Sequence, residues 1–363
     1  MNDDIECLET TVTRLGTALA PDGDATEAEG ILNPAVTRDR DGKLLLYPRA
    51  VAAGNVSRVA LVEASGPSDA PVFKRSGFVL QPEAPYERRP TGGYGCEDPR
   101  VTFVPALDQY VMTYTAFGPL GPRIAMALSR DGYAWERLGL ADFSAPGLPC
   151  GDDKDAAFFP EPVRSPNGVL SFAFYHRPML HVSAMDGRAA VPLILELPPS
   201  ERESARIAYV PVEPVLADRR NLLRVAESAL VLPPQPEWGR IKTGGGTPPV
   251  RVAEGWMSLY HGVDAESRTD GRVAMMYRAG IVIHDAESPH IVRYRSPEPV
   301  LAPQTSEERF GTVPDVVFPT GIDPVPHADR SYDVYYGMAD IRIGRAHLGL
   351  GESTLAGDAE SAA

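Results

Sequence analysis

Gly95-Cys96-Glu97-Asp98-Pro99-Arg100, followed by Tyr110-Val111-Met112-Thr113-Tyr114, is the stretch that points to the fold. It joins a turn ending in Pro to an aromatic-rich strand pattern. The same pair of features occurs five times along the chain. The five Pro turns are Asn33-Pro34, Asp98-Pro99, Glu161-Pro162, Pro248-Pro249 and Val313-Pro314. The strand patterns that follow them are 44–47, 110–114, 170–175, 256–260 and 332–336. Strands that return at a period of roughly 65 residues are typical of a radial or stacked architecture.

Each repeat is too small to stand alone, because a four-stranded antiparallel sheet has a face to bury and edges to protect. Five such sheets around one axis solve both problems. We therefore predict an all-β fold, a five-bladed β-propeller, within the usual four to eight blades. A β-sandwich is the rival from pattern alone, but it does not explain the near-constant interval between Pro turns. The 36 Pro and 33 Gly residues also favour short strands and many turns.

The repeats divide the chain into three expected parts. Residues 1–28 are acidic and weakly patterned, and we interpret them as a short N-terminal arm or helix. Residues 29–350 form the predicted propeller, with one long interval at 181–240 that we interpret as a blade with a longer loop. Residues 351–363 are small and polar and are expected to be a mobile C-terminal tail.

The composition argues against several classes of partner and location. The chain has 35 Lys and Arg against 49 Asp and Glu, a net charge of −14, and no basic run, which argues against nucleic acid and anionic membranes. Cys7, Cys96 and Cys150 are scattered, so no disulfide framework or metal site is predicted. Residues 1–6 are acidic and lack the apolar stretch of a signal peptide, and no apolar run reaches membrane length. A cytoplasmic location is expected.

One group of polar residues surrounds Asp98. The inner strands of a propeller converge on its axis, so polar residues of distant repeats are expected to share one pocket. An Asp before Pro is expected to be extended, and the nearby Gly95 indicates close approach of backbone or ligand. A carboxyl held there could act as a general acid. An Asx-turn that caps the strand is the structural alternative.

A second group is basic and comes from different repeats. It comprises Lys154, Arg177, Lys242 and His261. If they converge, they would repel one another unless an anion joined them, and phosphate suits their donors. Taken singly, each has a structural alternative: Lys154 pairs with Asp152 or Asp153, Lys242 is solvated, and the other two make buried hydrogen bonds.

The glycine run Gly244-Gly245-Gly246-Thr247 lacks the Lys-Ser/Thr ending of a P-loop and precedes no helix pattern. We interpret it as a tight loop that brings backbone close to a ligand. Motifs for nucleophilic Ser chemistry and for zinc proteases are absent from the sequence.

Taken together, these segments resemble glycoside hydrolase family 130, which comprises β-mannoside phosphorylases and related β-mannosidases. The matching segments are Asn33–Val36, Gly95–Arg100, Lys154–Glu161, Tyr175–Pro178, Lys242–Pro249, Tyr260–Val263, Val316–Gly321 and Tyr335–Asp340. The resemblance implies a five-bladed propeller, in agreement with the repeat count.

The resemblance also implies roles for individual residues. Asp98 matches the family's catalytic acid. Phosphate binding is implied for Lys154, Arg177, Lys242 and His261, although the first of these positions is often Arg in the family. Sugar binding is implied for Asn33, Arg49 and Asp340, with Glu97, Arg100 and Tyr260 around them.

The implied reaction is an inverting phosphorolysis of a terminal β-mannosidic bond. Phosphate is a co-substrate and no other cofactor is expected. An inverting β-mannosidase of the same family is the first alternative, and a non-catalytic sugar-binding propeller is the second. The acceptor sugar, the β-1,2 or β-1,4 linkage and the formation of a homo-oligomer stay open.

Overall fold

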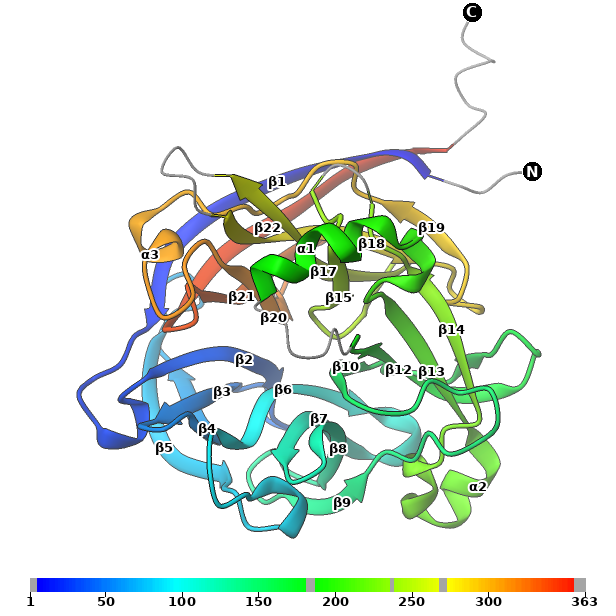
Figure 1. Cartoon of the computed structure of the whole chain (residues 1–363), viewed down its shortest axis with the longest axis horizontal. Coiled ribbons are helices and arrows are strands. Elements are labelled where there is room, and N and C mark those ends of the chain that lie inside the picture. The colour runs from blue at the N-terminus through cyan, green and yellow to red at the C-terminus, as the bar shows by residue number, and fades with distance from the viewer. Residues whose placement is uncertain (1–4, 181–186, 236–237, 268–272, 356–363) are drawn as a thin grey trace, which may run out of the picture.

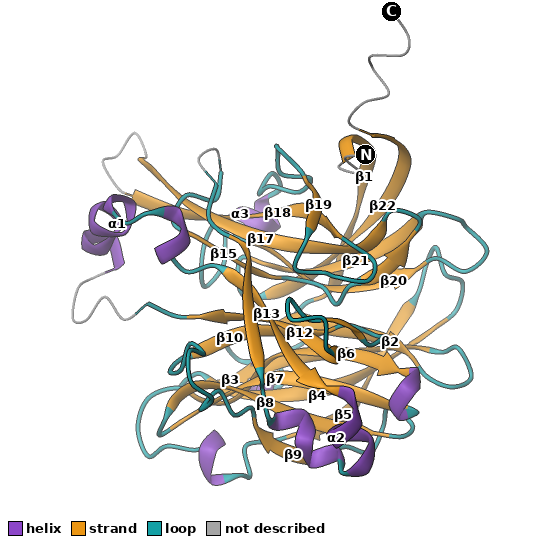
Figure 2. Cartoon of the chain, turned by 90° about the vertical axis from the view of Figure 1, so that its right-hand side faces the viewer, coloured by secondary structure: helices purple, strands orange, loops and turns teal. Residues whose placement is uncertain are grey.

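A computed structural model describes residues 5–180, 187–235, 238–267 and 273–355. The described chain is built of antiparallel sheets with few short helices, so the predicted all-β class is confirmed (Figures 1 and 2). Within the described ranges, the α-helices are α1 (Gly187–Glu196), α2 (Val212–Ala217) and α3 (Ser306–Arg309), and short 3-10 turns connect some of the strands. Among the described residues, no helix has the length and apolar character needed to span a bilayer.

Four sheets contain the described strands. The largest has eight strands, which are β2 (Gly30–Arg38), β3 (Leu44–Ala52), β4 (Val56–Ser65), β5 (Val72–Leu80), β6 (Tyr94–Val104), β7 (Gln109–Gly118), β8 (Gly121–Ser129) and β9 (Glu136–Leu140). Its two halves, β2–β5 and β6–β9, are joined through a short parallel pairing of Val56 with Tyr94 and Ser57 with Gly95.

The other three sheets follow in sequence order. The second consists of β10 (Asp153–Phe158), β11 (Val163–Arg164), β12 (Leu170–Pro178), β13 (Ala205–Pro211) and β14 (Glu227–Leu232). The third consists of β15 (Lys242–Gly245), β16 (Val250–Val252), β17 (Gly255–Ser267), β18 (Val273–His284) and β19 (Val292–Arg295). The fourth consists of β20 (Val317–Pro324), β21 (Ser331–Met338), β22 (Arg342–Leu355) and β1 (Ile5–Leu19).

Five strands lie towards a common centre in Figure 1. They are β2 and β6, which begin the two halves of the largest sheet, and β10, β15 and β20 of the other three sheets. Contacts between β2 and β6, β6 and β10, β10 and β15, and β20 and β2 connect these strands. The five predicted aromatic strands are confirmed as β3, β7, β12, β17 and β21. Each carries a buried tyrosine, namely Tyr47, Tyr114, Tyr175, Tyr260 and Tyr336. These rings pack in the hydrophobic core, where burial of aromatic area stabilises the fold.

Two of the predicted Pro turns are bulges inside strands. The pairing register skips between Leu32 and Ala35 in β2 and between Glu97 and Arg100 in β6. Asn33 and Asp98 therefore adopt left-handed φ angles of 45° and 46°, so the expected extended geometry before Pro is wrong. Asn and Asp tolerate this conformation, and a bulge turns a side chain away from the regular alternation of the strand.

The N-terminal segment is mainly a strand, and among its described residues the helical part is a single 3-10 turn at Ala25–Glu27. β1 pairs antiparallel with β22, with Leu8 opposite Ser353 and Leu19 opposite Ile343. Its run of Thr and Val residues is typical of a strand. β22 ends at Leu355, so the expected boundary at residue 350 falls inside it. Residues 356–363 of the expected tail lie outside the described residues.

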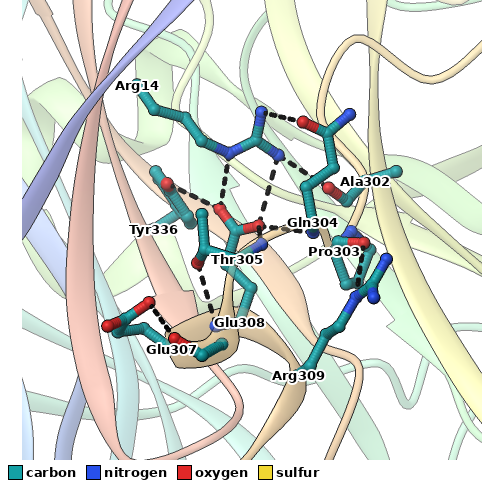
Figure 3. Close-up of polar contacts among 10 residues, drawn as sticks. Arg14, Ala302, Pro303, Gln304, Thr305, Glu307, Glu308, Arg309 and Tyr336 are labelled. Carbon is teal, nitrogen blue, oxygen red and sulfur yellow. Dashed lines mark hydrogen bonds and ion pairs between the residues drawn. The ribbon is translucent and has the colours of Figure 1, made fainter.

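A buried carboxylate fixes β1 to the segment before β20 (Figure 3). Arg14 of β1 donates to Glu308 Oε1 over 2.8 Å and to the carbonyl of Ala302 over 2.7 Å. The Tyr336 hydroxyl donates to the same carboxylate oxygen over 3.0 Å, and Thr305 caps α3 through the Glu308 backbone amide. The Glu308 carboxylate thus joins β1, α3 and β21.

Candidate active site

A cavity of about 200 Å³ lies where the inner strands of the sheets meet. Its walls are formed by Asn33, Arg49, Asp98, Lys154, Asp155, Arg177, Met179, Lys242, His261, Tyr277, Val316, Phe318 and Asp340. These residues come from all four sheets and the segments beside them. Eight predicted site residues therefore surround one cavity, while their roles stay predictions.

Asp98 reaches the cavity from the bulge in β6. The Asn33 amide donates to Asp98 Oδ1 over 2.8 Å, and Arg49 Nη1 lies 3.3 Å from the same oxygen. Burial opposes ionisation of this carboxyl, but Arg49, Lys154 and the Asn33 hydrogen bond outweigh it and lower its pKa. In the ligand-free chain Asp98 is therefore a carboxylate at neutral pH.

Asp340 faces the same cavity, and its pKa is shifted in the opposite direction from that of Asp98. It also has a left-handed backbone, with φ of 51°. Burial and the nearby Asp98 raise the pKa of Asp340 to about 6, against the opposing effect of Arg49 and Lys154. Asp98 and Asp340 thus differ in the pH at which each takes up a proton, because the cations and the Asn33 amide favour charge on Asp98.

Glu97 lies behind the cavity wall and holds two of its cations. Its Oε1 accepts from Arg49 Nη2 over 2.9 Å, and its Oε2 lies 3.2 Å from Lys154 Nζ. Lys154 therefore pairs with Glu97, and the alternative of a partner in Asp152 or Asp153 is wrong. Glu97 is 2% exposed and does not line the cavity, so it orients Arg49 and Lys154 from behind, while its predicted sugar contact stays a prediction.

Arg177 is held between two carboxylates. Its Nε donates to Asp155 Oδ2 over 2.5 Å, and its Nη1 forms an ion pair with Glu203. Burial disfavours the charged guanidinium, but Asp155 and Glu203 outweigh this effect and raise its pKa. Arg177 is therefore a fixed cation whose direction is set by two partners.

His261, which the sequence identifies only as a potential cation, is held neutral by its surroundings. Burial lowers the pKa of His261 to about 3, with Arg177 and Lys242 acting in the same direction and Asp155 against it. Its Nδ1 lies 3.1 Å from the carbonyl oxygen of Gly245, which can only accept, so Nδ1 carries the proton. Positive charge at the predicted basic set is thus confined to its Lys and Arg members.

Carboxylates of the chain itself reduce the repulsion between the cations of this set. Glu97 pairs with Lys154, and Asp155 and Glu203 pair with Arg177. Lys242 Nζ lies 5.2 Å from the ring centroid of Tyr277. Carboxylates of the chain therefore offset the charges of Lys154 and Arg177, so the expectation that only an anion would relieve the repulsion is wrong.

Two further predicted site residues lie outside the cavity wall. Arg100 is buried and donates to the carbonyls of Gly246 over 2.5 Å and Asp98 over 2.9 Å, which supports the backbone around the acid. Tyr260 precedes His261 in β17, and successive side chains of a strand point to opposite faces. Its hydroxyl accepts from Arg295 over 3.0 Å and its ring packs beside Trp238, while its predicted sugar-binding role stays a prediction.

Some wall residues were missed by reasoning from sequence. Phe318 lies in a segment that carries the family resemblance, and its strand position would have been the signal. Val316 begins the same segment, whereas Met179 and Tyr277 lie outside the matching segments and carry no sequence signal of this kind. The rings of Phe318 and His261 have centroids 4.6 Å apart, so Phe318 forms an apolar wall beside the imidazole.

Among the described residues, no cluster of three or more His, Cys, Asp or Glu side chains is placed to hold a metal ion. The donors around the cavity suit an anion and a polyhydroxylated ligand instead, because charged and neutral hydrogen-bonding groups alternate around it.

Comparison with known proteins places the chain in a family. A family model described as beta-1,4-mannooligosaccharide phosphorylase matches residues 24–165 and 221–352. The chain belongs to glycoside hydrolase family 130. The resemblance predicted from the sequence motifs is thereby confirmed. The two parts of the chain that match the family 130 model include Asp98, Lys154, Lys242, His261 and Asp340. Arg177 lies in the interval between these two parts.

Two relatives in family 130 come from Thermoanaerobacter sp. (strain X514). A 1,2-beta-oligomannan phosphorylase is 30% identical over 258 residues, covering 70% of this chain and 68% of that protein. A beta-1,2-mannobiose phosphorylase is 30% identical over 273 residues, covering 74% of this chain and 70% of that protein.

Solved structures show the same fold. The beta-1,2-mannobiose phosphorylase of Listeria innocua, in complex with beta-1,2-mannobiose, has a TM-score of 0.65 at 21% identity. The match covers 93% of this chain and 96% of that one. The fold of the chain is therefore that of a family 130 member.

Proposed function

We propose that the protein is an inverting phosphorylase that cleaves a terminal β-mannosidic bond with inorganic phosphate. The products are α-mannose 1-phosphate and a shortened sugar. The observation that carries the proposal is the common cavity of Asp98, Lys154, Arg177, Lys242 and His261. The names of the two Thermoanaerobacter relatives support it.

In the proposed reaction, phosphate attacks the anomeric carbon from the face opposite the leaving sugar. Lys154, Arg177 and Lys242 screen its charge and orient it, which is largely an effect of proximity. Asn33, Arg49 and Asp340 bind the mannose. Phosphate is already anionic, so the reaction does not need the second carboxylate that activates water in ordinary inverting hydrolases.

Asp98 supplies a proton to the glycosidic oxygen in this mechanism, although its pKa is lowered in the ligand-free chain. Bound phosphate would bring negative charge next to Lys154 and so weaken the stabilisation of the Asp98 carboxylate. Bound sugar would exclude water from the carboxyl and raise its pKa further. The proton is then available when both substrates are present.

The proposal extends to the architecture. The strand groups β2–β5, β6–β9, β10–β14 and β15–β19 form four blades, and β20–β22 with β1 form the fifth. The parallel link between β4 and β6 joins only two residue pairs, which supports counting its sheet as two blades. The proposed enzyme uses phosphate as a co-substrate and no further cofactor.

A product assay tests the function. The protein is incubated with β-1,2- and β-1,4-mannobiose, each with and without inorganic phosphate, and the products are separated by anion-exchange chromatography. Mannose 1-phosphate formed only in the phosphate samples is expected. Equal release of free mannose without phosphate would identify a hydrolase. Sugar binding without any product would favour the non-catalytic alternative.

A further inference from the structure

The anion side of the cavity contains hydrogen-bond acceptors as well as cations. Asp155 has a left-handed φ of 61° at a bulge in β10, where the pairing register skips between Lys154 and Ala157. The bulge turns its carboxylate to the cavity wall, where it is 5% exposed. One of its oxygens accepts from Arg177, and a carboxylate can accept several further bonds.

His261 presents a second acceptor beside this carboxylate. Because its Nδ1 donates to the Gly245 carbonyl, its Nε2 carries a lone pair. Nε2 lies 3.7 Å from Asp155 Oδ2, which is too long for a hydrogen bond. Two acceptors therefore lie side by side without a proton between them.

Gly244 provides the space that lets Asp155 and His261 lie so close together. A Cβ placed on Gly244 would overlap Asp155 Oδ2 and the His261 ring. Gly244 pairs with His261 across β15 and β17, so the missing side chain leaves room for both acceptors above its backbone. The arrangement is built into the strands and does not depend on a surface loop.

We propose that Asp155 and His261 make the anion pocket selective for an oxyanion that carries a proton, such as hydrogen phosphate, over one that carries none, such as sulfate. This inference rests on the proposed phosphorylase function. The P–OH group of hydrogen phosphate donates to Asp155 or to His261 Nε2, while its other oxygens accept from Arg177 and Lys242. Sulfate at neutral pH has no hydrogen to donate.

Binding of an unprotonated oxyanion in such a pocket has two free-energy costs. It leaves an acceptor without a donor, and it brings oxygen lone pairs against a buried carboxylate, where like charges repel strongly. The expected discrimination is about a hundredfold in affinity, since a buried polar group without a partner costs a few kcal/mol and each tenfold change in affinity corresponds to about 1.4 kcal/mol.

The test measures anion binding directly by isothermal titration calorimetry in phosphate-free buffer at pH 7.5 and constant ionic strength. The probes are inorganic phosphate, sulfate and monofluorophosphate. Monofluorophosphate has the charge and the approximate size of hydrogen phosphate, but fluorine replaces the P–OH group. Phosphate is expected to bind about a hundredfold more tightly than either of the others.

The Asp155→Asn variant has an amide that can donate to sulfate, so the preference for phosphate is expected to fall at least tenfold. Asp323→Asn is the matched control. Asp323 is a buried aspartate paired with Arg38 beside a different cavity, and its replacement is expected to leave the preference unchanged.

Each outcome decides between the proposals. Equal binding of the three anions by the unaltered protein would refute the proposed selectivity without affecting the proposed phosphorylase function. This comparison needs no variant. A preference that survives in Asp155→Asn would remove Asp155 from the inference. Absence of phosphate binding together with absence of phosphate-dependent cleavage would refute the proposed function itself.

Discussion

Asp340→Asn is expected to stabilise the folded protein at neutral pH. Asp340 is half-buried, and burial together with the charge of Asp98 raises its pKa to about 6 from an ordinary 3.8. The folded chain therefore holds the Asp340 proton more tightly than the unfolded chain does. Ionising Asp340 then costs folding free energy, and an amide of the same shape avoids that cost.

The size of the effect follows from the pKa difference. At about 1.4 kcal/mol per pKa unit, a change from 3.8 to about 6 corresponds to about 3 kcal/mol. This is an upper limit, because solvent reaching the partly exposed carboxylate screens it. The cost is absent below pH 3.8 and complete above pH 6, so the gain is about half as large at pH 5 as at pH 8.

Urea unfolding of both proteins at pH 5 and pH 8 measures the gain. At about 2.1 cal/mol/K for each of 363 residues, 3 kcal/mol also corresponds to a rise in Tm of about 4 °C. Asp98→Asn is the matched comparison from the same cavity. The pKa of Asp98 is lowered by its surroundings, so this variant is expected to lose stability at pH 8. A stabilised Asp98→Asn, or an Asp340→Asn whose gain does not grow with pH, would refute the electrostatic argument.

The remaining predictions concern catalysis and the β1 contact. Asp98→Asn is expected to abolish turnover of mannobiose but to retain cleavage of an aryl β-mannoside, whose leaving group needs no proton; near-normal turnover of mannobiose, followed by product chromatography, would remove Asp98 from the acid role. Arg177→Ala is expected to raise the KM for phosphate steeply, and His261→Ala to raise it less, because the imidazole is neutral; parent-like cleavage by both variants in phosphate-free buffer would identify a hydrolase. Arg14→Ala leaves the buried Glu308 carboxylate without its cation and is expected to cost about 3 kcal/mol of unfolding free energy. The exposed Arg220→Ala serves as its control and is expected to leave stability unchanged in the same urea titration.

Sequence patterns predicted the parts of this protein that depend on periodicity. Aromatic-rich runs after turns ending in Pro identified β3, β7, β12, β17 and β21, and each of these strands carries a buried tyrosine, because burial of a strand face is a local, repeated requirement. The convergence of Asp98 with the basic residues followed from repeat geometry combined with the family resemblance.

The charge state of the site could not be predicted in the same way. The ion pairs of Arg177 with Glu203 and of Lys154 with Glu97 depend on which strands lie side by side. The neutral state of His261 depends on its burial and on the Gly245 carbonyl. The ion pairs and the charge state both depend on distances between side chains of different strands. Such distances cannot be predicted from any single segment of the sequence. The left-handed geometry of Asp98 was missed because the usual restriction before Pro gives way at a bulge.

The pairing of β1 with β22 has a consequence for biosynthesis. β1 leaves the ribosome long before its partner, and it must stay unpaired until residues 342–355 have been translated. An unpaired strand edge invites association with other chains, and contacts between distant parts of a sequence slow folding. Completion of the fourth sheet is therefore expected to be a late step in folding, and the nascent chain is most exposed to association with other chains before that step.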